Sequence, residues 1–177
     1  MPFDHRLATL EDRPGLVQLM DRAIDQLQRA YLSPEQISAS HAMMGIDTEL
    51  IRDGTYFIIE DAGIMAGCGG WSRRATLYGG DHSTDLRESR LLDPATDPAR
   101  IRAMYTDPAF VRRGVGRLIL QLCEQAAAAA GFTQIEMMAT LSGEPLYRAA
   151  GYRVIAPDAY TKGDVTVPLL RMGKTLG

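Results

Sequence analysis

Residues 104–117 read MYTDPAFVRRGVGR, and this stretch decides the fold. The strand predicted for residues 100–106 ends here, because Asp107-Pro108 interrupts it. After Gly114, apolar side chains recur at helical spacing, which predicts a helix over residues 114–130. A strand that passes through a tight turn into a long helix is typical of a mixed α/β domain.

The start of this helix has the properties of an anion-binding site. The first turn of a helix exposes backbone N–H groups at the positive end of its dipole. Gly114 and Gly116 let the backbone approach a ligand closely, and Arg112, Arg113 and Arg117 add positive charge. A pyrophosphate suits this arrangement. The segment lacks the Gly-Lys-Ser/Thr of a nucleotide P-loop and the third glycine of the dinucleotide-binding fingerprint. Taken alone, it fits a helix start with a surface arginine cluster equally well.

The flanking sequence completes an α/β pattern without internal repeats. Ser33, Pro34 and Gln36 predict a capped helix start. Its face would contain Ile37 and His41, which favours a core position for His41. Residues 72–99 predict a long loop with room for a short helix. The other predicted elements are strands at 3–10, 55–60, 64–71, 133–139, 152–156 and 164–172, and helices after Asp12 and at 142–150.

Length and composition limit the remaining classes of protein. The 177 residues suit one ordinary domain, with 46% hydrophobic and 23% charged residues. The net charge of −3 gives no case for nucleic acid or an anionic membrane, although nearly all basic residues are arginine. No stretch is long and apolar enough to span a membrane or serve as a signal core, so we expect a cytoplasmic protein. The two cysteines have no metal-ligand spacing, so we expect no metal.

Two ordered motifs resemble the Gcn5-related N-acetyltransferase (GNAT) family. Residues 111–116, VRRGVG, are similar to its (Gln/Arg)-x-x-Gly-x-(Gly/Ala) loop, except that Val111 replaces Gln or Arg. Leu146-Tyr147 and Gly151-Tyr152 follow at the spacing of its Phe-Tyr-x-x-x-Gly-Phe-like segment. The resemblance is strong over about residues 100–157. Before residue 72, only the order of the predicted strands and helices is consistent with the family.

The resemblance implies an α/β (α+β) fold in which residues 1–177 form a single GNAT-like domain. Its sheet would have six or seven mostly antiparallel strands, flanked by helices, and one splayed parallel pair. Acetyl-CoA would be the co-substrate. Its pantetheine arm would pair with the backbone of Met104, Tyr105 and Thr106. Residues Arg112, Arg113, Gly114, Val115, Gly116 and Arg117 would hold its pyrophosphate.

The resemblance also implies catalytic roles. Tyr147 stands where many relatives keep a tyrosine near the sulfur, as a general acid or hydrogen-bond donor. Many relatives place a glutamate base on the strand before the loop, and residues 100–106 contain no carboxylate. Glu136 is our candidate base. His82, Asp81, His41 and a water chain to solvent stay open as alternatives.

The function implied is direct acetyl transfer from acetyl-CoA to a primary amine of a small molecule or peptide. A non-catalytic acyl-CoA-binding or regulatory module is the alternative, since the strand lacks a carboxylate. A phosphate-binding surface without CoA is a third. The first two helices, around Tyr31, and residues 72–99 should set specificity. Acidic residues in 72–99 hint at a cationic acceptor, but arginines balance them. Because domains of this family are often dimers, the resemblance also implies a possible homodimer.

Overall fold

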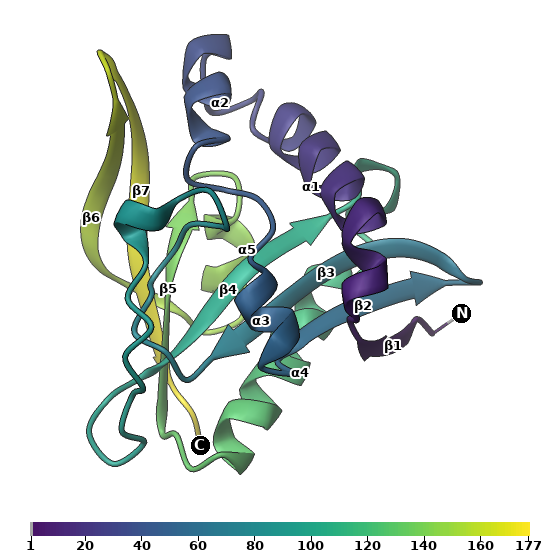
Figure 1. The fold of residues 1–177 in the computed structure, drawn as a ribbon, viewed down its shortest axis with the longest axis vertical. Coiled ribbons are helices and arrows are strands. Elements are labelled where there is room, and N and C mark those ends of the chain that lie inside the picture. Colours follow the sequence, from purple (N-terminus) through teal and green to yellow (C-terminus); the bar gives the residue numbers. More distant parts are fainter. Residues whose placement is uncertain (1) are drawn as a thin grey trace.

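The structure, a computed structural model, describes residues 2–177 and contains one seven-stranded sheet in the order β1-β2-β3-β4-β5-β7-β6 (Figure 1). Its strands are β1 (Asp4–Leu7), β2 (Tyr56–Asp61), β3 (Ile64–Ser72), β4 (Ala99–Thr106), β5 (Gln134–Thr140), β6 (Arg153–Lys162) and β7 (Val165–Thr175). The α-helices are α1 (Arg13–Leu27), α2 (Pro34–Ser40), α3 (Thr48–Arg52), α4 (Val115–Ala129) and α5 (Glu144–Ala149). Among residues 2–177, no helix is long and apolar enough to cross a membrane.

The sheet confirms the predicted architecture, including the splayed parallel pair. All neighbouring strands are antiparallel except β4 and β5. These two are paired only at Ala99–Ile135 and Arg100–Glu136. From Ile101 onward the facing edges of β4 and β5 separate, which leaves backbone groups of β4 without a strand partner.

Helices cover both faces of the sheet. Ile58 and Ile59 are neighbours on β2, so their side chains point to opposite faces. Ile59 packs in the core cluster that contains Ile119 of α4, whereas Ile58 packs with Leu16 of α1. Figure 1 accordingly shows α1 and α3 in front of the sheet and α4 behind it. The first cluster includes residues of both β4 and β5, whereas the second includes Tyr105 of β4 and no residue of β5.

Local sequence signals predicted most elements, with three differences. The predicted capping box of α2 is present: the Ser33 side chain accepts from the amide of Gln36, and the Gln36 side chain accepts from that of Ser33. The last two strands extend well beyond the predicted ends, as a long hairpin. Helix α3 was not predicted, because one turn is too short to show helical periodicity. The first strand is shorter than expected.

The long segment between β3 and β4 is irregular, as predicted, apart from a 3₁₀ turn at Thr84–Leu86 and one β-bridge between Arg74 and Leu91. Ion pairs hold it against α3 and its flanks. Arg74 donates to Asp53, and Arg87 donates to both Asp47 and Glu49. The segment therefore forms a fixed wall beside the sheet.

A close approach between α4 and β3 yields a stability prediction. A Cβ at Gly67 would lie 2.4 Å from Cγ1 of Val115, a branched side chain with little freedom to move. We expect Gly67→Ala to lower the free energy of unfolding by about 1–3 kcal/mol, measured by urea denaturation. The matched control is Gly15→Ala in α1, where the nearest atom is 3.4 Å away. It should raise stability by up to about 1 kcal/mol. Equal effects of both would contradict the packing argument.

Candidate active site

A groove of about 740 Å³ runs from the start of α4 along the free edge of β4 to α5 and α1. This volume is within the range of ligand sites. Its walls include eight of the nine residues predicted to bind the cofactor, and Tyr147. The eight are Met104, Tyr105, Thr106, Arg112, Gly114, Val115, Gly116 and Arg117; Arg113 does not line it. The structure thus brings together residues from three separate elements.

The loop before α4 presents a row of unpaired amides to this groove. The N–H groups of residues 112–117 donate no hydrogen bond to any other group in residues 2–177. Arg112 and Gly114 have left-handed φ values of 61° and 86°, a conformation that glycine adopts without strain. Gly116 has a further role, since a Cβ there would lie 2.5 Å from Cδ2 of Leu146. Its small size thus lets α5 pack against α4.

The three arginines of this loop do not act alike. Arg112 and Arg117 are exposed and line the groove. The Arg113 side chain instead donates to Asp61 of β2 at 3.0 Å and lies over the rings of Phe3 and Phe110. Its guanidinium is therefore held outside the groove. Loop spacing could not distinguish these orientations, because Asp61 is distant in sequence.

The free edge of β4 is shaped by a bulge. Cys68 pairs with Tyr105 and Gly70 with Arg102, so the partner strand has one residue fewer than β4 at this point. Ala103, in the bulge, has a left-handed φ of 50°. The buried hydroxyl of Tyr56 donates to the carbonyl oxygen of Ala103 at 2.6 Å and fixes the distorted backbone. Sequence reasoning missed Tyr56, which reads only as a strand residue.

Tyr147 lies at the inner end of the groove, on α5. Burial raises the pKa of its phenol to about 12, so it stays protonated at neutral pH. Its hydroxyl makes no hydrogen bond to another group in residues 2–177 and is free to donate to a ligand. The ring of Tyr152 contacts it edge-on, with centroids 6.3 Å apart. Gly143 makes room for it, since a Cβ there would lie 2.7 Å from Cε2 of Tyr147.

The predicted base, Glu136, lies elsewhere. Its carboxylate accepts from Arg171 at 2.6 Å and from Arg100 at 3.4 Å. It lines a separate surface depression near β6 and β7, and neither it nor its partners line the groove with Tyr147. These ion pairs favour a structural role, and its role as a base stays a prediction. Strand alternation alone did not tell which face Glu136 occupies.

The alternative bases also have partners of their own. Asp81 accepts from the amide and hydroxyl of Thr48 and from Arg13. Although burial opposes it, these bonds lower the pKa of Asp81. His82 faces the carbonyl oxygen of His41 at 2.6 Å. None of the three residues lines the groove.

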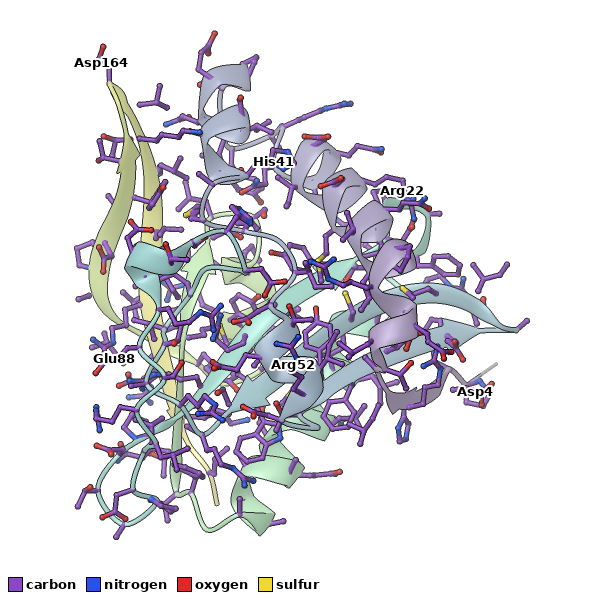
Figure 2. All side chains as sticks on the ribbon, in the orientation of Figure 1. Asp4, Arg22, His41, Arg52, Glu88 and Asp164 are labelled. Carbon is purple, nitrogen blue, oxygen red and sulfur yellow. The ribbon has the colours of Figure 1, made fainter. Side chains whose placement is uncertain are left out.

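The expected core position of His41 is wrong. Helix α2 ends at Ser40, so His41 leaves the helix face that Ile37 occupies. Its side chain is 36% exposed, and Nε2 lies 2.7 Å from Oδ1 of Asp25 on α1. Figure 2 shows it between the two helices. His41 therefore links α2 to α1 at the surface.

Comparisons with known proteins agree with this geometry. The sequence model of the acetyltransferase (GNAT) domain matches residues 52–154. A GCN5-related N-acetyltransferase from Rhodopseudomonas palustris has a TM-score of 0.73 at 20% identity, covering 99% of this chain and 97% of that one. PaiA N-acetyltransferase from Thermoplasma acidophilum, solved with coenzyme A, has a TM-score of 0.66 at 13% identity and covers 99% of both chains.

A third solved structure, YncA from Salmonella typhimurium with acetyl-CoA, has a TM-score of 0.65 at 16% identity. The match covers 100% of this chain and 95% of that one. At these identities the likeness concerns the fold. No curated protein matches the sequence.

Proposed function

This chain belongs to the GNAT acetyltransferase family, and we propose that it moves the acetyl group of acetyl-CoA directly to a primary amine of a small molecule or peptide. The observation that carries the proposal is the groove, which joins a row of free amides, an unpaired strand edge and an unpartnered tyrosine hydroxyl. We also propose that residues 1–177 act as one domain, since strands from both ends of the chain share the sheet.

The groove fits acetyl-CoA in the order of its chemical groups. The amides of residues 112–117, with Arg112 and Arg117, suit the pyrophosphate. The free edge of β4 at Met104, Tyr105 and Thr106 suits the amides of the pantetheine arm, which would pair as an added strand. The thioester would then lie near Tyr147, at the inner end.

Bound acetyl-CoA supplies an activated acetyl group whose thioester carbonyl carbon accepts a nucleophile. In the proposed transfer, the amine nitrogen forms a bond to that carbon and the carbon–sulfur bond breaks. The Tyr147 hydroxyl donates to the departing sulfur. The amine loses one proton, which we assign to water at the open groove because Glu136, Asp81 and His82 line none of it.

The test uses the whole chain in two measurements. Calorimetry with acetyl-CoA should show saturable binding. If acetyl-CoA did not bind, the assignment of the groove as its binding site would be wrong. Release of free thiol is then followed with a panel of primary amines and short peptides. Amine-dependent release supports the proposed function. Saturable binding without release for any member of the panel would instead favour the non-catalytic acyl-CoA-binding module.

A further inference from the structure

A second, smaller cavity adjoins the groove beside Tyr147. Its volume is about 80 Å³, roughly five times what a single water needs. Met44, Met104, Tyr105, Thr140 and Tyr147 line both cavities. We call the smaller one the inner chamber. It lies where β4 and β5 have separated, and residues 77–79 of the long segment between β3 and β4 form part of its wall.

Most of the side chains that line the inner chamber are apolar, and one is charged. Five methionines dominate them: Met43, Met44, Met104, Met137 and Met138. Unbranched thioether side chains adapt to the shape of a small apolar ligand. Arg102 of β4 is the one charged residue among the described residues that line the chamber. It is 2% exposed, so its charge must be matched by a partner.

Arg102 has a partner for only part of its guanidinium. Nη2 donates to Oδ2 of Asp47 and to the carbonyl oxygen of Gly79, both at 2.8 Å. Both bonds come from Nη2, and Nε and Nη1 donate none to another group in residues 2–177. The buried Asp47 also accepts from Arg87 at 3.1 Å, and Arg87 donates to Glu49 at 2.9 Å as well. Arg102 thus retains two donor nitrogens, Nε and Nη1, at the chamber wall.

We propose that the inner chamber selects an acceptor that carries a carboxylate on a compact apolar body, and that Arg102 holds this carboxylate. The inference rests on the proposed function, because it names the acceptor of the same site. A planar guanidinium with free donors matches a carboxylate, and the methionines match an apolar side chain. The amine then lies toward Tyr147 and Thr140, where the chamber meets the groove. A free apolar amino acid has these three groups; a peptide N-terminus lacks the adjacent carboxylate.

A cationic acceptor is disfavoured by the same wall. The acidic residues of the segment between β3 and β4, which hinted at such an acceptor, do not line the chamber. Asp81 is engaged by Thr48 and Arg13, and Glu88 by Arg90. A positive substituent inside the chamber would lie beside the guanidinium of Arg102, and no carboxylate is among the described residues that line the chamber to offset the repulsion.

The first experiment compares leucine with leucinamide on the unaltered protein, by thiol release from acetyl-CoA. Leucinamide keeps the side chain and the amine and lacks the negative charge. We expect kcat/KM to be at least about tenfold higher for leucine. Leucinamide used as well as leucine would overturn the inference and leave the proposed function standing. If no amine of any kind supported thiol release from acetyl-CoA, both the inference and the proposed function would be overturned.

The second experiment tests Arg102 itself. In Arg102→Gln, kcat/KM for leucine should fall roughly 10- to 100-fold, while the value for leucinamide stays within about threefold. The control is Arg100→Gln. Arg100 is another buried arginine of β4, but it pairs with Glu136 and does not line the chamber. Its variant should keep the leucine-to-leucinamide ratio. An equal loss for both acceptors in Arg102→Gln would mean a purely structural role. If that variant does not fold, the comparison on the unaltered protein still decides.

Discussion

Replacing Tyr147 with phenylalanine should lower kcat roughly 10²-fold, because the departing thiolate loses its hydrogen-bond donor. The Kd for acetyl-CoA should change little, since the amides and arginines that face the pyrophosphate lie at the other end of the groove. Calorimetry measures the Kd, and thiol release with a saturating amine measures kcat. Turnover at the unaltered rate would remove Tyr147 from the mechanism.

The control for this variant is Tyr152→Phe. Tyr152 contacts the ring of Tyr147, but its own hydroxyl donates to Glu124 at 3.1 Å, and it does not line the groove. Removing the Tyr152 hydroxyl should lower the free energy of unfolding by about 1 kcal/mol and leave kcat within about threefold of that of the unaltered protein. The pH profile adds a second check. Because burial raises the pKa of Tyr147 to about 12, ionisation of this phenol should not reduce kcat below about pH 10.

The double variant Arg112→Ala/Arg117→Ala should raise the Kd for acetyl-CoA about tenfold. Both side chains are exposed, so each contact with phosphate contributes up to about 1 kcal/mol, and added salt should weaken the difference. Arg113→Ala should change the Kd less than about twofold, because its side chain pairs with Asp61 outside the groove. Calorimetry at two salt concentrations makes the comparison.

A matched ligand separates phosphate contacts from general damage. S-acetylpantetheine lacks the pyrophosphate, so its affinity should be the same in the double variant and the unaltered protein. If Arg113→Ala weakened acetyl-CoA binding as much as the double variant, the orientation of Arg113 toward Asp61 would not describe the protein in solution.

Much of the fold could be predicted from local sequence because the signals act over a few residues. Ser33, Pro34 and Gln36 specify a helix start through bonds within one turn. Asp107-Pro108 ends β4, and Gly114 takes the left-handed φ that precedes α4. The short α3 and the full length of the β6–β7 hairpin escaped prediction, since α3 depends on side chains such as Asp81 and the hairpin on pairing between its strands.

The candidate site was predictable in its backbone and less so in its side chains. The position of the amides at residues 112–117 follows from the strand, turn and helix that contain them. The direction of the Arg113 side chain does not, because it depends on Asp61 of β2 and on two phenylalanine rings. The same holds for Glu136, whose partners Arg100 and Arg171 lie on two neighbouring strands.

The sequence by itself determined the order of the strands and of every α-helix except α3, the loop of free amides and the family, since each depends on residues close together in the chain. Only the tertiary structure decided which side chains share the groove and what the inner chamber contains. Arg102 reads in the sequence as one more arginine among many. Its partial neutralisation by Asp47, 55 residues away, follows from the packing of α3 and the segment between β3 and β4 against the sheet. In a low-dielectric interior, such long-range neighbours decide whether a charge is satisfied or left to bind a ligand.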